Sequence, residues 1–126
     1  MAGLLAGKRV LITGVLTDAS IAFAAARLAH AEGAEVLLTG FGRGLSLTRR
    51  MAGRIAPEIP VLELDVTDEE QVGSLATRFE EAVGAGGRLD GVVHAIGFAP
   101  QNALGEGFVD VPWSDVSVAV QVSTWS

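Results

Sequence analysis

The chain has 126 residues with 15 acidic and 9 basic side chains and no cysteine, which is enough for one domain with a modest core and excludes a disulfide framework or a thiolate zinc site. The acidic balance and the absence of a Lys/Arg run argue against nucleic acid or an anionic membrane as a partner, and we expect no metal site. No apolar stretch approaches membrane-spanning length and residues 1–7 lack the charge pattern of a signal peptide, so we expect a cytoplasmic protein.

The chain begins with an apolar run that leads through a glycine turn into a helix. Val10 to Ile12 forms the run, Gly14 breaks it, and an Ala-rich helical pattern starts at Ser20 and Ile21. The first amides of such a helix have no partners inside the helix, and the helix dipole adds roughly half a positive charge there. Donors that converge on one point attract phosphate, so the pattern suggests a dinucleotide ligand.

A second strand and helix follow. The first helix extends from Ile21 to Glu32, where Gly33 stops it, and its small residues suit close packing against a sheet. Glu35 to Thr39 is predicted as a strand buried on both faces, because its centre is continuously apolar. Leu45 to Ile55 is predicted as the second helix.

The rest of the chain repeats this alternation. Pro60 to Leu64 is a third predicted strand, and the sequence T-D-E-E from Thr67 to Glu70 is a capping box that opens the third helix. Leu89 to Ile96 is the fourth predicted strand. Trp113 to Ser126 is predicted to be the start of a fourth helix.

Four strands that alternate with helices predict an α/β fold. With right-handed crossovers they form a Rossmann-type, doubly wound parallel sheet in the order 3-2-1-4, and a flavodoxin-like order is the alternative. The sequence stops without a fifth strand, although the complete fold has about six. We therefore expect an incomplete domain that contains the first four strands.

Ligands of open parallel sheets bind beyond the carboxyl ends of the strands, near the point where the strand order reverses. The candidates for a nucleotide site at these ends are Gly14, Ser20, Ile21, Phe41, Asp65, Ile96 and Gly97. Gly14 would let the backbone approach a pyrophosphate, Phe41 would pack on adenine or ribose, and Asp65 would accept from the adenine amino group. Ordinary roles stay open for these residues: a turn glycine, an N-cap serine, an aromatic folded onto Leu45, and an aspartate that begins the turn before Thr67. The two histidines are interpreted as structural.

Five stretches resemble one enzyme family when they are taken together. They are G-L-L-A-G-K-R-V-L-I-T-G at 3–14, T-D-A-S-I-A-F at 17–23, L-T-G-F at 38–41, L-E-L-D-V at 62–66 and L-D-G-V-V-H-A-I-G-F at 89–98. These stretches are similar to the enoyl-acyl-carrier-protein reductases of bacterial type II fatty-acid synthesis, which are short-chain dehydrogenases/reductases, and within them to the NADH-dependent long-chain type of mycolic-acid synthesis. That family replaces the plain G-x-G-x-x-G turn, which is missing here, with G-x(5)-S-[IA], matched by Gly14, Ser20 and Ile21.

The resemblance implies hydride transfer from NADH to C3 of a trans-2-enoyl thioester on acyl-carrier protein, followed by protonation at C2. It implies NAD contacts, by position, at Ser20, Ile21, Asp65, Val66, Ile96 and Gly97, with Gly14 and Phe41 beside them and Val122 near the floor of the cofactor site. Phe98 and Ala99 would face the substrate. Residues 1–126 would then be the N-terminal part of a single NAD-binding Rossmann domain from a homotetramer, truncated before the catalytic segment.

The family's catalytic tyrosine and lysine follow the fifth strand region. This chain has no tyrosine, and its one lysine, Lys8, precedes the first strand. No catalytic residue is therefore assigned, and we expect the 126-residue chain to be inactive as a reductase when it is expressed alone.

The loop after the second strand bears on the choice of cofactor. An acidic residue there normally binds the ribose hydroxyls and repels a 2′-phosphate, but the loop reads Gly40-Phe41-Gly42-Arg43. The resemblance favours NADH, and Arg43 without a carboxylate would tolerate NADPH.

Three other functions are weighed against this one. A ketoacyl reductase of the same superfamily would show T-G-x-x-x-G-I-G at the first turn and N-A-G after the fourth strand, where this chain has A-I-G-F. A methyltransferase would need a carboxylate at the end of the second strand. A non-catalytic nucleotide-binding remnant agrees with the missing tyrosine.

Overall fold

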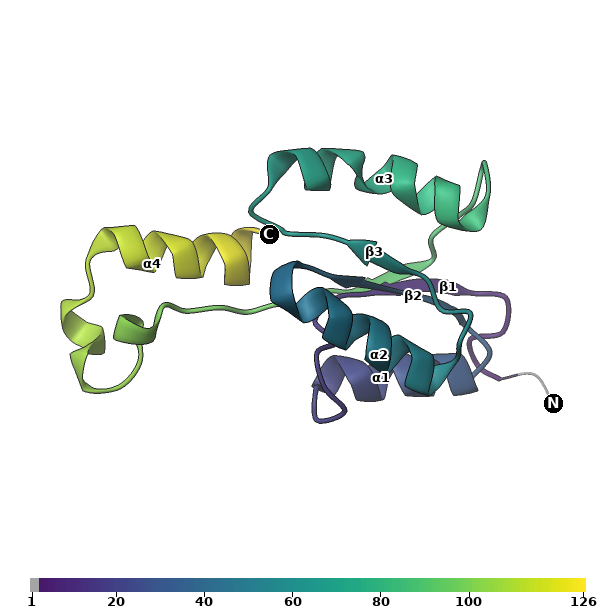
Figure 1. Ribbon diagram of the computed structural model, residues 1–126, viewed down its shortest axis with the longest axis horizontal. Helices are drawn as coiled ribbons and strands as arrows, with labels where there is room; N and C mark the ends of the chain where they lie inside the picture. Colours follow the sequence, from purple (N-terminus) through teal and green to yellow (C-terminus); the bar gives the residue numbers. More distant parts are fainter. Residues whose placement is uncertain (1–2) are drawn as a thin grey trace. The chain divides into compact units, whose positions relative to one another are not determined.

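Figure 1 shows the computed structural model of the chain, in which residues 3–126 are described. Its four strands are β1 Arg9–Ile12, β2 Glu35–Gly40, β3 Val61–Glu63 and β4 Gly91–Val93. They form one sheet in the order β3-β2-β1-β4, and every neighbouring pair is parallel. The predicted Rossmann-type order is confirmed. A flavodoxin-like order is excluded because β3 pairs with β2 and β4 takes the other side of β1.

Helices cover both faces of this sheet (Figure 1). On one face, α1 (Ile21–Ala31) and α2 (Leu45–Ile55) pack on the strands around the buried residues Ile12 and Leu38. On the other face, Phe79 of α3 (Glu69–Val83) packs with Leu11 and Leu37. β2 lies between β3 and β1 with helices on both sides, which explains its continuous apolar run.

The first helix contacts the sheet through alanine. Ala22, Ala26 and Ala29 are buried, whereas the side chain of Ile21 is 88% exposed and that of Leu28 is 63% exposed. The predicted close packing of a small-residue helix is present, and the half-buried Phe23 packs against the same core, whereas Ile21 and Leu28 do not. Alanine has a small side chain, so the backbone of α1 can lie close to the sheet. The helix begins directly after the loop that follows β1.

Several predicted element boundaries are corrected by the structure. The predicted strands at 60–64 and 89–96 are ordered as strands only over Val61–Glu63 and Gly91–Val93. The capping box is also wrong by one residue. Asp68 is the N-cap of α3, because its carboxylate accepts from the amides of Glu70 and Gln71. The hydroxyl of Thr67 instead donates to Asp65.

The chain divides into two compact units, one ending at Ala95 and the other comprising Ile96–Ser126. The second unit contains two short 3₁₀ turns, then α4 (Trp113–Val120) and one π-helical turn over Gln121–Trp125, so the predicted fourth helix is α-helical only in its first part. Within this unit the hydroxyl of Ser123 accepts from the amide of Phe98 and donates to its carbonyl. Among residues 3–126, no helix has both the length and the apolar character needed to cross a membrane.

Candidate functional site

The carboxyl ends of the four strands of the first unit lie at one edge of the sheet. The amide of Leu64, just after β3, donates to Gly40 at the end of β2 (2.8 Å), and the amide of Thr13, just after β1, donates to Val93 of β4 (3.0 Å). Parallel pairing therefore brings the loops that follow β1, β2 and β3 to the same edge. We call this edge the carboxyl edge, and it includes the loop residues 14–20, 41–44 and 65–67. Open parallel sheets bind their ligands at such edges.

Gly14 turns the chain at the centre of this edge. Its φ is +83°, a conformation that other residues rarely adopt, and a Cβ there would lie 1.9 Å from the carbonyl oxygen of Ala95. Both the backbone conformation and the approach of the chain after β4 therefore require glycine. The close approach of Ala95 therefore accounts for the glycine at this position.

Ser20 closes the loop between β1 and α1. It is the N-cap of α1, but its hydroxyl accepts from the amides of Leu16 (3.2 Å) and Thr17 (3.1 Å) and not from an amide of the helix. The amides of Ile21 and Ala22, at the first two helical positions, consequently have no partner inside the helix. The first turn of α1 has no acidic residue. Its positive dipole end is thus available to an anion.

Thr48, which the sequence analysis missed, joins the loops after β1 and β2. Its side chain is completely buried, and its hydroxyl donates to the carbonyl of Val15 at 2.6 Å, with a longer contact to Gly44 at 3.2 Å. A Cβ on Gly40 would lie only 2.8 Å from this hydroxyl oxygen. The sequence contains one signal for this role. Thr48 is a polar, β-branched residue that lies three positions before Met51 and four before Ala52, so it shares the buried face of α2 with them.

The β2–α2 loop presents two exposed side chains. Phe41 is 49% exposed, so the aromatic ring is not buried against the start of α2. Gly42–Gly44 forms a short 3₁₀ turn with the exposed Arg43 at its centre. Gly44 is packed tightly, because a Cβ there would lie 2.8 Å from Leu16 of the neighbouring loop.

Asp65 holds the turn between β3 and α3. Its Oδ1 accepts from the amide (2.9 Å) and the hydroxyl (2.7 Å) of Thr67, and its own amide donates to Gln71 at 2.7 Å. The expected turn role is confirmed. The second carboxylate oxygen has no hydrogen bond within residues 3–126, so it is free to accept from a ligand. Val66 beside it is half-buried.

The structure therefore groups the predicted residues in two sets. Those at the carboxyl edge of the first unit are Gly14, Ser20, Ile21, Phe41, Asp65 and Val66. Those in the second unit are Ile96, Gly97, Phe98, Ala99 and Val122. Within the second unit, Gly97, Phe98 and Ala99 line an apolar hollow of about 520 Å³ whose other wall includes Val116 and Val120 of α4.

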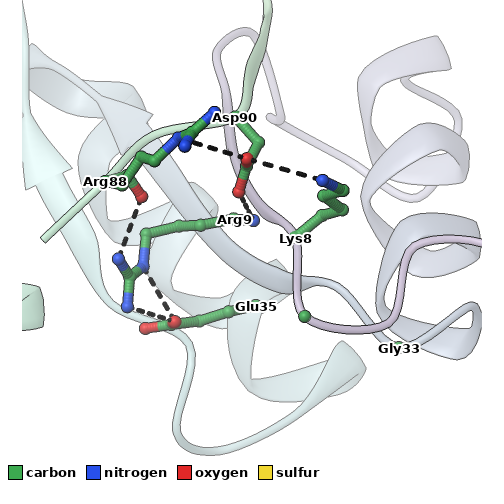
Figure 2. A pocket seen from close by; sticks show the side chains of 7 residues that line it. Lys8, Arg9, Gly33, Glu35, Arg88 and Asp90 are labelled. Atoms are coloured by element: carbon green, nitrogen blue, oxygen red, sulfur yellow. Dashed lines mark hydrogen bonds and ion pairs between the residues drawn. The ribbon is translucent and has the colours of Figure 1, made fainter.

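A second hollow, of about 400 Å³, lies at the opposite, amino end of the strands (Figure 2). Arg9 of β1 donates from Nε to Glu35 of β2 (2.8 Å), and its backbone amide donates to Asp90 before β4 (2.9 Å). That backbone hydrogen bond, together with the charges of Lys8 and Arg88, holds the pKa of Asp90 below its ordinary value. The cations form ion pairs with Glu35 and Asp90, and these contacts join β1 to β2 and to the residue before β4. We therefore assign the cluster a structural role.

No group of three or more His, Cys, Asp or Glu side chains in the described part of the chain is arranged to hold a metal ion. His94, beyond β4, has its Nδ1 3.1 Å from the hydroxyl of the buried Thr13, which also accepts from the amide of Ala95. This contact is consistent with the structural role expected for that histidine.

Comparison with known proteins gives a consistent result. The family model described as Enoyl-(Acyl carrier protein) reductase matches residues 14–126. The chain is 50% identical to the enoyl-(acyl-carrier-protein) reductase (NADH) of Mycolicibacterium smegmatis over 100% of its length, and 46% identical to that of Mycobacterium avium over 98%. Identity to the corresponding Escherichia coli enzyme is 36% over 98% of the chain. The alignments cover 47%, 46% and 47% of these relatives, so the chain spans about half of their length.

Proposed function

Because the chain belongs to the enoyl-acyl-carrier-protein reductase family, we propose that it binds NADH for the reduction of a trans-2-enoyl thioester carried by acyl-carrier protein. The observation that carries this proposal is the carboxyl edge itself. A left-handed glycine, the unpaired first amides of α1 and the ends of three strands lie together there. The names of the relatives specify NADH, which agrees with a dinucleotide at this position.

Each candidate residue has a role in this proposal. Gly14 and the first amides of α1 bind the pyrophosphate, and the hydroxyl of Ser20 keeps the loop closed around it. Phe41 and the free oxygen of Asp65 bind the adenosine end. The second unit supplies the remaining contacts, which are Ile96, Gly97 and Val122 to the nicotinamide half of the cofactor and Phe98 and Ala99 to the substrate.

The cofactor supplies the hydride when it is bound, and the residues described above bind and orient it. Residues 1–126 contain no tyrosine and only one lysine, Lys8, which precedes β1 at the amino end of the sheet. We therefore propose that this polypeptide, expressed as the 126 residues alone, binds NADH but does not oxidise it when a 2-enoyl thioester is added.

The resemblance supports three further proposals. The two units belong to one NAD-binding Rossmann domain, the whole protein is a homotetramer, and it works in the cytoplasm with the other enzymes of fatty-acid synthesis.

Titration of the purified chain with NADH tests the proposed function. We expect saturable binding that is lost in Gly14→Val, because the added side chain would clash with the carbonyl of Ala95 and displace the glycine turn proposed to face the pyrophosphate. Gly73→Ala is the matched control, since a Cβ on this α3 glycine meets nothing within 4 Å. Absence of NADH binding by a chain with native-like circular dichroism would refute the proposal, and NADH oxidation with an enoyl thioester would refute the predicted inactivity.

A further inference from the structure

Arg78 of α3 is a half-buried cation that meets no opposite charge. None of the ion pairs within residues 3–126 includes it. Its guanidinium instead donates to three neutral oxygens, which are the carbonyl of Glu63 at 2.6 Å, the carbonyl of Gln71 at 2.9 Å and the hydroxyl of Ser74 at 3.1 Å. Because this guanidinium neutralises no carboxylate, its contribution lies in the fixed geometry of its N–H donors.

The carbonyl of Glu63 lies at the outer edge of the sheet. β3 is the last strand in the order β3-β2-β1-β4 (Figure 1). The carbonyl of Pro60 and the amide of Leu64 face β2, because they form hydrogen bonds with it. Backbone groups alternate in direction along a strand, so the carbonyl of Glu63 points away from β2, where no strand can pair with it. Arg78 supplies the donor that a neighbouring strand would otherwise provide.

Arg78 thereby joins the two ends of the turn between β3 and α3. Glu63 is the last residue of β3, and Gln71 lies in the first turn of α3. The segment between them contains Asp65, whose free carboxylate oxygen is proposed to bind the adenosine end of the cofactor. One guanidinium therefore fixes the strand end and the helix start that carry this aspartate.

Gln71 connects Arg78 to Asp65 itself. The backbone carbonyl of Gln71 accepts from Arg78, and its side-chain Oε1 accepts from the amide of Asp65 at 2.7 Å. The carboxylate of Asp65 is oriented in turn by Thr67, which donates twice to Oδ1. These contacts form one continuous path from the guanidinium to the carboxylate, and they leave the second oxygen of Asp65 in a defined position.

We propose that Arg78 is a positioning residue for the NADH site, because it holds the β3–α3 turn so that the free oxygen of Asp65 can accept from the adenine amino group. This inference rests on the proposed function, which places the adenosine end of the cofactor at Asp65. It goes beyond that function by assigning a role in cofactor affinity to a residue that acts through the turn and not through a contact of its own.

Calorimetric titration of the 126-residue chain with NADH and with 5′-AMP tests this role. Arg78→Met keeps an unbranched side chain and removes its donors, and it should weaken the binding of both ligands about fivefold, the effect of one ordinary hydrogen bond. Arg78→Lys keeps the charge but lacks the fork that reaches two carbonyls at once, so it should bind NADH no more than about twofold better than Arg78→Met. Arg27→Met is the matched control and should change neither affinity, because Arg27 is exposed on α1 and forms no ion pair in the described residues.

A double-mutant cycle separates positioning of Asp65 from a general effect on the fold. Asp65→Asn keeps an oxygen that can accept from Thr67 but places an amide donor at the free position, so it removes the proposed contact with adenine. In that background Arg78→Met should weaken NADH binding by less than about twofold more. A further loss of about fivefold would show that Arg78 acts independently of Asp65 and would overturn the inference.

Amide hydrogen exchange gives a readout that needs no ligand. The amide of Asp65 should exchange faster in Arg78→Met than in the parent chain, and at the parent rate in Arg27→Met. Gln71→Met is the second variant if Arg78→Met does not fold, because it removes the acceptor of the Asp65 amide and leaves the backbone contact of Arg78 intact. It should show the same faster exchange and the same weaker NADH binding.

Two results would overturn this inference and leave the proposed function intact. One is an Arg78→Lys chain that binds NADH as tightly as the parent chain, since charge alone would then be sufficient. The other is a folded Arg78→Met or Gln71→Met chain in which neither NADH affinity nor exchange of the Asp65 amide changes. A folded parent chain that binds no NADH would overturn the proposed function and, with it, this inference.

Discussion

The hydroxyl of Thr48 donates to the carbonyl oxygen of Val15 at 2.6 Å, across 33 positions of sequence. This buried hydrogen bond fixes the start of α2 against the loop after β1, so the two loops of the carboxyl edge that are proposed to bind the phosphates and the ribose are held in one arrangement. Gly40 lets the two approach, because any side chain there would meet the Thr48 hydroxyl. Thr48 therefore acts as a positioning residue for the proposed nucleotide site.

Replacement of Thr48 by valine should destabilise the first unit and weaken NADH binding. Valine keeps the shape of the side chain but leaves the carbonyl of Val15 without its donor, which costs about 1–3 kcal/mol for a buried group. Urea denaturation measures the loss. Thr48→Ser keeps the hydroxyl, so it should bind NADH more tightly than Thr48→Val does.

Thr77→Val on the exposed face of α3 is the control, and it should change the free energy of unfolding by less than about 0.5 kcal/mol. Equal NADH affinities in Thr48→Val and Thr48→Ser would contradict the positioning role of the hydroxyl.

Replacement of Gly14 by alanine should be more damaging than most single substitutions in this chain. The methyl group would lie 1.9 Å from the carbonyl oxygen of Ala95, and the backbone would keep a φ of +83° that alanine disfavours. Backbone strain alone costs about 1–3 kcal/mol, and the displacement of the chain after β4 adds to it. Thermal unfolding followed by circular dichroism checks this. Gly73→Ala, in an open helical position, should instead stabilise the chain by up to about 1 kcal/mol.

Removal of the Ser20 hydroxyl should affect NADH binding more than stability. Ser20→Ala leaves the amides of Leu16 and Thr17 without their acceptor, but both residues are exposed and water replaces it, so the expected cost is about 1 kcal/mol. The loop that faces the pyrophosphate would lose its closure, and the NADH dissociation constant should rise by about tenfold. Ser46→Ala, on the exposed surface of α2, is the matched control. A dissociation constant unchanged in Ser20→Ala would show that the hydroxyl is not needed.

The sheet order, and with it the edge at which the strands end, could be predicted from the sequence because both depend on local patterns. Apolar runs of strand length alternate with helical segments, and Gly14 and Gly33 mark the turns that separate them. Right-handed crossovers then leave few possible orders. The family resemblance used the same local stretches, and the comparisons confirmed it.

Contacts between residues far apart in the sequence could not be predicted in this way. Thr48 and Val15 are 33 positions apart, and Arg9 meets Asp90 across 81 positions. The hydrophobic periodicity of the sequence contains no information about such pairs. The register of the sheet and the packing of the helices determine which of these distant residues meet. The cap of α3 was misplaced for a related reason. Thr67 and Asp68 both suit an N-cap, and the competing hydrogen bond of Thr67 to Asp65 decided between them.

The carboxylate of Asp90 should make the stability of the first unit depend on pH. The Arg9 amide and then the nearby cations lower the pKa of Asp90 in the folded chain. The stabilisation is therefore fully present above the unfolded pKa, about 3.9, and is lost as the pH falls through the lower, folded pKa. Asp90→Asn should accordingly lower the urea midpoint at neutral pH.

The gap in urea midpoint between the parent chain and Asp90→Asn measures the contribution of the charge of Asp90. An asparagine has the same shape and can still accept from the Arg9 amide, but it attracts neither Lys8 nor Arg88. We expect this gap to shrink as the pH falls below the unfolded pKa, about 3.9, because the unfolded chain then takes up a proton before the folded chain does. Asp110→Asn, at an exposed residue of the second unit, should show no gap at either pH. A gap for Asp90→Asn that persists unchanged well below the folded pKa would mean that the geometry of the side chain, and not its charge, joins β1 to β4.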